Sequence, residues 1–211
     1  MSYRREAWAN QPAVIIASGT SLSDEQLAIV ERAHLEQRVK VIAVNNTIER
    51  APWADVSYWG DYTAIKHYRP KLVALTIAEW VTIDRAAAER WGLTFVKPSP
   101  TNGMSHERIH VNGNSGSQAI CLAAVFGARR ILLLGFDMQP GPDGRAHWFG
   151  QHPGNLVTRQ LFDEWLRKAE VIARDAKALG VEVVNCTPGS AMRCFAESSI
   201  ERELEAQGIE P

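Results

Sequence analysis

Short apolar runs recur along the chain and divide it into alternating segments. The four clearest lie at residues 13–17, 40–44, 130–134 and 181–184. None alternates with polar residues, and unbroken apolar runs of this length are typical of parallel strands that are covered on both faces. Two weaker runs, at 55–59 and 71–76, are expected to add further strands. The pattern therefore predicts a mostly parallel sheet at the centre of the fold.

Helical patterns lie between these runs. Residues 24–37 carry apolar side chains at helical spacing behind Ser23 or Asp24 as the N-cap, and residues 115–126 are small and apolar nearly all round. Residues 156–179 form a long amphipathic pattern that ends before a C-capping glycine, Gly180. Alternating strands and helices predict an α/β fold, a doubly wound, mostly parallel Rossmann-like sheet with helices on both faces. We expect one domain over residues 1–197 and a C-terminal helical tail at 198–211.

Two segments lack any regular period. Residues 97–114 and 139–155 are rich in proline and glycine. Loops longer than about 12–15 residues in a compact domain are usually functional or disordered. The second segment holds two histidines and a tryptophan, which disordered linkers seldom keep. We therefore expect residues 139–155 to form a long lid loop over a binding site.

Composition narrows the class of protein. The 211 residues carry 23 Lys and Arg against 24 Asp and Glu, which gives a formal net charge of -1. This balance excludes binding to nucleic acid or anionic lipid through the overall charge of the protein. It does not exclude binding through a local basic groove. No apolar run approaches the roughly 20 residues of a membrane span, and the N-terminal residues lack a signal-peptide pattern. We expect a cytoplasmic protein with no membrane partner.

The three cysteines are odd in number and lack metal-binding spacing. Cys121, Cys186 and Cys194 are therefore expected to be reduced and mostly buried thiols.

In open α/β sheets, ligands bind beyond the carboxyl ends of the strands, so the residues after each strand are candidates. Gly19, Thr20 and Ser21 follow the first strand, where the glycine, the hydroxyls and the helix amides suit a phosphate. An ordinary capped turn explains them equally. Asn45 and Asn46 follow the second strand and could read a ribose or a base edge, or form a turn.

Three further turns belong to the same edge of the predicted sheet. Asp61 follows the third strand and either holds an ion or hydroxyl or caps the next helix. Asn114, Ser115 and Gly116 open the small-residue helix, and so dense a polar cluster favours a second anion or sugar site over capping alone. Thr187 lies in the polar turn after the last strand.

The candidates for chemistry are a carboxylate and two imidazoles. Asp137 follows the strand at 130–134, where active-site carboxylates usually lie, or else ties down the loop behind it. His147 and His152 lie among aromatic residues in that loop, and imidazole can take a proton from an attacking hydroxyl near neutral pH. Two histidines without a third ligand make a weak zinc signal, so no metal site is predicted.

The ordered set of these motifs resembles a known family. The segments are VIIASGTSLS, VNN, NSGSQAICLAAVFGARRILLLGFDM, HWFGQHPGN and VEVVNCTPGS. They resemble the Rossmann-like proteins grouped with bacterial sialyltransferases of glycosyltransferase family 42. They are still more similar to the DUF115 group, which includes archaeal-type 6-hydroxymethylpterin diphosphokinases and many phage proteins.

The likeness covers roughly residues 13–195 and implies roles for single residues. It implies that the donor nucleotide is held by Gly19, Thr20, Ser21, Asn45, Ser115 and Gly116. It also implies that His152, which matches the family's general base with one inserted residue, deprotonates the acceptor. A phage-encoded member would act in the host cytoplasm.

The leading hypothesis is a metal-independent glycosyltransferase with no tightly bound cofactor. Its donor would be a nucleotide sugar, for example a CMP-linked one, and His147 or Asp137 would orient His152 or neutralise charge. The acceptor would be a hydroxyl of a glycan, a small molecule or a hydroxymethylated DNA base.

Two other functions stay open. One is an ATP- and magnesium-dependent diphosphokinase, in which Asp61 and Asp137 hold the magnesium through its waters. The other is a non-catalytic nucleotide-binding module. The sequence leaves the donor, the acceptor and the formation of a homo-oligomer undecided.

Overall fold

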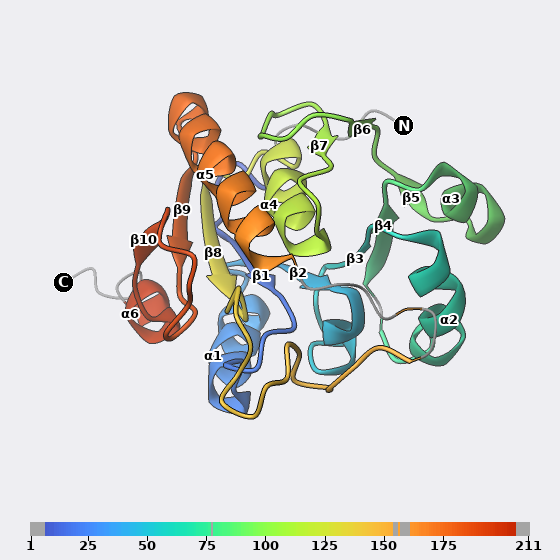
Figure 1. The fold of residues 1–211 in the computed structure, drawn as a ribbon, viewed down its shortest axis with the longest axis horizontal. Helices are drawn as coiled ribbons and strands as arrows, with labels where there is room; N and C mark the ends of the chain where they lie inside the picture. Colours follow the sequence, from blue (N-terminus) through green and yellow to red (C-terminus); the bar gives the residue numbers. More distant parts are fainter. Residues whose placement is uncertain (1–6, 77, 154–155, 157–160, 206–211) are drawn as a thin grey trace.

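An eight-stranded parallel sheet forms the centre of the protein, in a computed structural model that describes residues 7–76, 78–153, 156 and 161–205. Its order is β10-β9-β8-β1-β2-β3-β4-β5 (Figure 1). In chain order its strands are β1 (Ala13–Ile16), β2 (Lys40–Val44), β3 (Val56–Trp59), β4 (Glu79–Thr82), β5 (Thr94–Phe95), β8 (Arg130–Leu134), β9 (Glu182–Asn185) and β10 (Ala196–Glu197). Strands β6 (Pro98–Ser99) and β7 (Ile109–His110) form a separate parallel pair.

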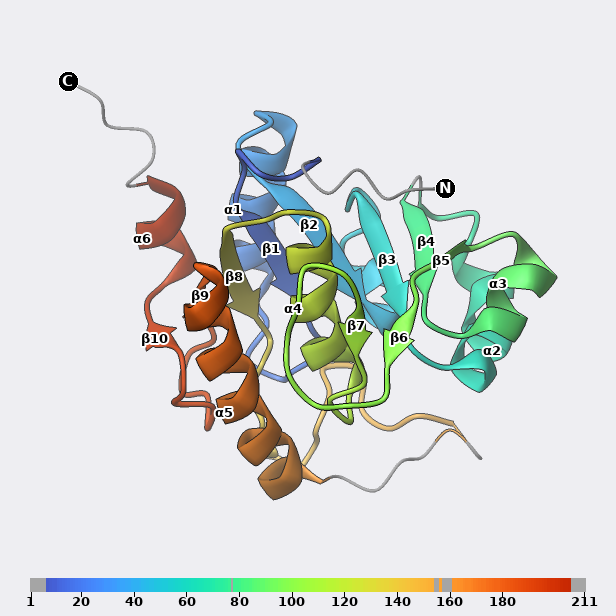
Figure 2. The same cartoon turned by 90° about the horizontal axis from the view of Figure 1, so that it is seen from above.

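Helices cover both faces of the sheet. They are α1 (Asp24–Leu35), the 3-10 helix η1 (Asn45–Glu49), α2 (Tyr62–Leu72), α3 (Arg85–Trp91), α4 (Ser115–Val125), α5 (Phe162–Leu179) and α6 (Ile200–Glu205). Figures 1 and 2 show α4 and α5 on one face and α1 on the other. The predicted doubly wound α/β fold is confirmed.

The central strands are apolar throughout because each residue belongs to one of two core layers. Ala13 and Ile15 of β1 pack in the layer that contains α4 and α5, whereas Val14 and Ile16 pack in the layer that contains α1 and α2. All four side chains are fully buried. This is the arrangement that unbroken apolar runs predict.

The helix ends follow the expected capping chemistry. Ser23 is the N-cap of α1, and its hydroxyl accepts from the amide of Gln26 while the Gln26 side chain accepts from Ser23 in return. Gly180 ends α5 in the left-handed region, with φ +69°. Helix α4 is buried from Ser117 to Val125, as its composition indicates.

Several predicted boundaries are wrong. The strand expected at 71–76 does not form, because Leu72 ends α2 and a turn follows it, and the strand is instead Glu79–Thr82. Ile65, Tyr68 and Leu72 are buried at helical spacing, and this packing overrides the short apolar run. The helix expected from residue 156 begins at Phe162. The segment 97–114, expected to be irregular, contains β6 and β7.

The C-terminal tail is partly described. Helix α6 packs on α1 and buries Ile200 and Leu204. Residues 206–211 of the predicted tail lie outside the described residues.

The direction in which the chain adds strands to the sheet reverses next to strand β1. The chain proceeds from β1 through β2 to β5 on one side, and from β8 to β10 on the other. Past the strand ends, the amide of Ala17 donates to the carbonyl of Leu134 (2.8 Å) and that of Gly19 to Gly135 (2.9 Å). The turns that follow β1 and β8 therefore begin side by side at the topological switch point, where ligands bind in this architecture.

Candidate functional site

A cavity of about 850 Å³ lies at the carboxyl ends of the central strands. This volume falls within the usual range for small-molecule sites. Nine of the sequence-predicted residues line it: Gly19, Asn45, Asp61, Asn114, Ser115, Gly116, Asp137, His147 and His152. Thr20, Ser21, Asn46 and Thr187 are described but lie outside this lining. Turns that are distant in sequence thus converge on one cavity, as the sheet topology predicts.

The first turn is bonded to Asp137. The amide and hydroxyl of Ser21 each donate to the carboxylate at 3.0 Å, and the Thr20 hydroxyl does so at 3.4 Å. A Cβ atom at Gly19 would lie 1.6 Å from Oδ2 of Asp137. The donors predicted to hold a phosphate here already have a carboxylate partner, so the geometry favours the alternative in which Asp137 fixes this turn.

The second predicted anion site lies at the start of α4, whose first residues form part of the cavity wall. Asn114 is the N-cap, and its Oδ1 accepts from the amide of Ser117 at 2.8 Å. Ser115 and Gly116 line the cavity, and no hydrogen bond to their amides is formed by the described residues. Free amides at a helix N-terminus suit an anionic ligand.

Lys168 of α5 is a lining residue that the sequence reasoning missed. It is the only lysine or arginine among the described lining residues. Its Nζ lies 2.8 Å from the position that a Cβ at Gly113 would take, which brings the ammonium next to the start of α4. Lys168 also pairs with Glu164, one turn earlier. The sequence places Trp165 and Lys168 on one face of the predicted helix. An amphipathic pattern alone does not show whether such a face lines a cavity or is exposed to solvent.

His147 anchors its loop to the end of β1. Its Nδ1 lies 2.9 Å from the hydroxyl of Ser18, and the next amide, that of Trp148, donates to the Ser18 carbonyl at 2.9 Å. The ring stacks on Phe149 with centroids 5.0 Å apart. Burial, with a smaller contribution from His152, lowers the pKa of His147 to about 4. The imidazole is therefore neutral at physiological pH and a weak base.

His152 lies in the same loop as His147 and lines the same cavity. Its Nδ1 lies 3.0 Å from the hydroxyl of Tyr68, and its ring centroid is 5.3 Å from that of His147. Burial lowers the pKa of His152, and the nearby His67 lowers it further. Tyr68 is a second residue that sequence reasoning missed, since it lies in α2, 84 positions away.

The four remaining predicted residues differ in their hydrogen bonds with the rest of the protein. Asn45, in the left-handed region at φ +52°, lines the cavity at the end of β2. Asp61 is the N-cap of α2 and accepts from the amide of Ala64 at 2.8 Å. The Thr187 hydroxyl is buried and accepts from the amide of Phe136 at 2.9 Å. Asn46 is 4% exposed, and its Oδ1 has no hydrogen-bond partner among the described residues.

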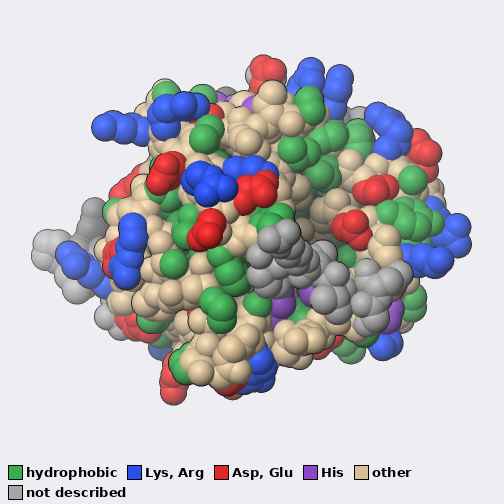
Figure 3. Space-filling view, viewed as in Figure 1, with side chains coloured by type: hydrophobic (Ala, Val, Ile, Leu, Met, Phe, Trp, Pro, Cys, Tyr) green, Lys and Arg blue, Asp and Glu red, His purple; other side chains and the backbone are tan. Residues whose placement is uncertain are grey.

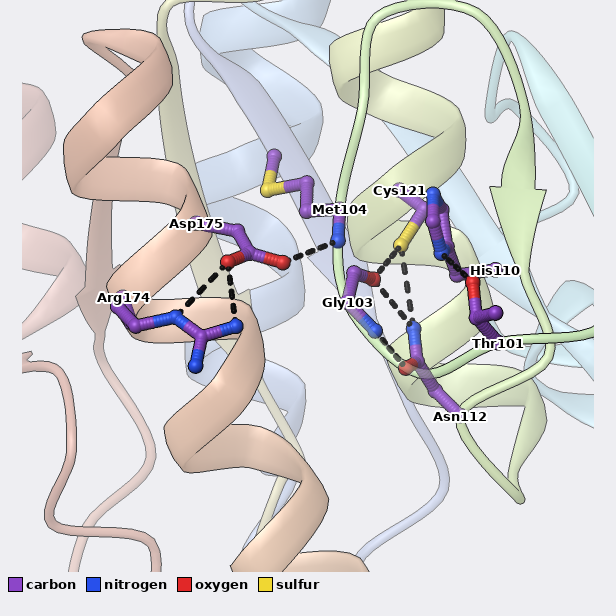
Figure 4. Close-up of polar contacts among 8 residues, drawn as sticks. All are labelled: Thr101, Gly103, Met104, His110, Asn112, Cys121, Arg174 and Asp175. Atoms are coloured by element: carbon purple, nitrogen blue, oxygen red, sulfur yellow. Dashed lines mark hydrogen bonds and ion pairs between the residues drawn. The ribbon is translucent and has the colours of Figure 1, made fainter.

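A buried polar network holds the segment before α4 (Figure 4). The Asn112 side chain accepts from the amide of Gly103 (2.8 Å) and donates to its carbonyl (3.0 Å) and to Sγ of Cys121 (3.3 Å). Asp175 of α5 accepts from the amide of Met104 at 3.1 Å. These contacts fix Gly113 and Asn114 at the cavity.

The three cysteines are free, and Cys121 and Cys186 are buried, as predicted. Burial raises the pKa of both buried thiols to about 12, so neither is a thiolate at neutral pH.

The fold matches that of a solved enzyme, the MAf glycosyltransferase from Magnetospirillum magneticum AMB-1. The TM-score is 0.62, and the match covers 94% of this chain at 13% sequence identity. The chain is similar in fold to a solved glycosyltransferase. It spans 36% of the length of that protein.

No protein-family model and no curated protein matches the chain. The resemblance to the sialyltransferases and the DUF115 group, and with it a phage origin, therefore stays a prediction.

The carboxylates of Asp137 and Asp61 at the cavity accept hydrogen bonds from the protein itself. Thr20 and Ser21 engage both oxygens of Asp137, and Asp61 caps a helix. Within the described part of the chain, no three His, Cys, Asp or Glu side chains come together as a metal site. Among the described lining residues, the cationic side chain is that of Lys168, which pairs with Glu164.

Two of the arginines have acidic partners within the described residues. Arg130 begins β8, at the end of the strand remote from the cavity, and pairs with Glu203, while Arg145 pairs with Asp143. Arg159 lies outside the described residues. On the face shown in Figure 3, Lys and Arg side chains are interspersed with Asp and Glu. Among the described helices, none has the length and apolar character needed to cross a membrane.

Proposed function

We propose that the chain binds a nucleotide sugar in this cavity and transfers the sugar to a hydroxyl group of an acceptor. The observation that carries the proposal is one cavity that is lined by the imidazole of His152 and also by Lys168 and the start of α4. A fold shared with a glycosyltransferase is consistent with it.

The donor's phosphates would lie against α4 and α5. The amides of Ser115 and Gly116 carry the positive end of the helix dipole, and the Lys168 ammonium adds a full charge beside them. Charge-assisted hydrogen bonds to phosphate are the strong ones. Asn45, at the end of β2, would read the ribose or the base. The nucleotide leaves as an anion, so the same groups would stabilise the leaving group without a metal ion.

His152 would act as the general base. Its pKa is lowered, so at neutral pH its imidazole is unprotonated and can take the proton of the acceptor hydroxyl as the oxygen attacks the sugar. A positioned base of this kind contributes about 10²–10⁴-fold. His147 would serve through its bond to Ser18, which holds the loop in place. The acceptor is a glycan, a small molecule or a hydroxymethylated DNA base.

A thermal-shift screen of the purified chain against nucleotides, nucleotide sugars and ATP with magnesium tests the binding step. A ligand at 100 times its Kd should stabilise the protein by about 2.7 kcal/mol. Stabilisation by a nucleotide sugar is the expected result. Stabilisation by ATP with magnesium, with turnover that EDTA abolishes, would instead establish a diphosphokinase.

His152→Gln tests the chemical step with the ligand found in that screen. Transfer should fall by the factor above while the thermal shift by the donor persists. His106→Gln, which replaces a histidine outside the cavity lining, should behave as wild type. Donor binding without any transfer, unaffected by either substitution, would identify a binding module instead.

A further inference from the structure

The contact between Tyr68 and His152 bears on which nitrogen of the histidine can act. The Tyr68 hydroxyl lies 3.0 Å from Nδ1 of His152. Tyr68 itself is only 7% exposed and packs on Trp59 with ring centroids 5.7 Å apart. Its helix is capped by Asp61 and buried against the sheet. The hydroxyl is therefore a fixed point against which the imidazole is placed.

A neutral imidazole has one N–H and one lone pair, so the partner of Nδ1 decides the character of Nε2. If Nδ1–H donates to the tyrosine oxygen, Nε2 keeps its lone pair and is the basic atom. If the tyrosine donates to Nδ1, Nε2 carries the proton and can only donate. Among the residues that the structure describes, the groups that face His152 are Tyr68 and His67 of α2, and His147 and Phe149 of its own loop.

We propose that Tyr68 is a positioning residue whose hydroxyl oxygen accepts from Nδ1–H of His152 and so leaves Nε2 as the base. The inference rests on the proposed function for its catalytic meaning. In the transfer step the acceptor oxygen bonds to the anomeric carbon, and the bond from that carbon to the nucleotide's phosphate oxygen breaks with its electron pair. Nε2 takes the proton of the acceptor hydroxyl, while Nδ1–H remains hydrogen-bonded to the hydroxyl oxygen of Tyr68.

His147 provides an internal comparison. Its Nδ1 also meets a hydroxyl, that of Ser18, at 2.9 Å. That contact lies in the turn after β1 and adjoins the backbone bond from Trp148 to Ser18, so it tethers the loop. Ser18→Ala is therefore the matched control for Tyr68→Phe, because each removes one hydroxyl from one histidine.

Nitrogen-15 NMR of histidine-labelled protein above pH 7 tests the proposal without any substrate. Resonances of His152 are assigned from their loss in His152→Gln. The wild type should show His152 with the proton on Nδ1, and Tyr68→Phe should shift its population towards the Nε2–H form. Ser18→Ala should move the resonances of His147 and leave the tautomer of His152 unchanged. A wild-type His152 protonated on Nε2 overturns the proposal, even where Tyr68→Phe fails to fold.

Kinetics separate this inference from the proposed function. Tyr68→Phe should lower kcat about 3- to 10-fold, the worth of one hydrogen bond, and leave the KM for the donor unchanged. If NMR finds Nδ1–H but His152→Gln transfers normally, Tyr68 still positions the ring and the base role fails. If His152→Gln abolishes transfer but the tautomer is Nε2–H, the base role stands and the role of Tyr68 fails.

Discussion

The carboxylate of Asp137 occupies the space that a side chain at Gly19 would need. A Cβ there would lie 1.6 Å from Oδ2 of Asp137 and 2.5 Å from the carbonyl oxygen of Gly135. Gly19→Ala must therefore displace the carboxylate from Ser21 or move the backbone after β8. We expect the free energy of unfolding to fall by more than about 2 kcal/mol, measured by urea denaturation.

Gly144→Ala is the control for this substitution. Gly144 has φ +77° and open space around its Cβ position, so only the backbone strain of about 1 kcal/mol applies. Equal losses for the two variants would contradict the close contact between Gly19 and Asp137.

Lys168→Gln should weaken donor binding, because it removes the cation from the cavity wall and keeps most of the side chain. The loss of a hydrogen bond to a charged group corresponds to about 10- to 100-fold in affinity. Arg167→Gln is the matched control, since Arg167 is the exposed neighbour on the same helix. Isothermal titration with the donor, at one fixed salt concentration, compares the two. An equal effect of both variants would indicate general electrostatics and not a contact in the cavity.

Asn112→Ala should destabilise the protein by about 3 kcal/mol. The amide is fully buried, and its removal leaves the buried amide and carbonyl of Gly103 without their partners, at about 1–3 kcal/mol each. Guanidinium denaturation measures the loss. Thr101→Ala, in the same segment but exposed, should cost less than about 1 kcal/mol. Because Asn112 fixes the segment that leads to Gly113, the Asn112 variant should also bind the donor more weakly.

The fold was predictable because its signal is local. Each central strand is buried on both faces, so its apolar run is visible in sequence, and the caps at Ser23 and Gly180 have their own chemistry. Strand β4 was misplaced because the apolar residues of 71–76 lie next to a helix whose extent is decided by the packing of Ile65 and Tyr68. Short elements such as β5 and α3 carry too few residues to show a period.

The site was predictable only where topology decides it. Turns that follow neighbouring parallel strands meet at one edge of a sheet, and this rule correctly predicted that Gly19, Asn45 and Asp61 lie at one cavity. It could not find Lys168 or Tyr68, because both lie inside helices and reach the site through tertiary packing. Nor could it decide between the two roles of Asp137, since that depends on three hydrogen bonds to residues 116 and 117 positions earlier.

The lowered pKa of His147 gives a signed prediction for stability. Its ordinary value is 6.5, and burial lowers it to about 4 in the folded state. Between these values the unfolded chain binds a proton at this residue and the folded protein does not. The free energy of unfolding therefore falls as the pH drops from 6.5 to about 4, by on the order of 3 kcal/mol from this group.

His147→Gln should flatten that part of the profile, because glutamine does not titrate in either state. Urea denaturation at pH 7.5, 6, 5 and 4 measures the slope in the wild type and the variant. The control is Asn102→Ala, an exposed substitution that removes no titrating group and should keep the wild-type slope. At pH 7.5 the His147 variant should be less stable than the wild type, because it loses the hydrogen bond to Ser18 and the stacking on Phe149. The curves of the wild type and the His147 variant should then converge with acid. Parallel curves would mean that folding does not lower the pKa of His147.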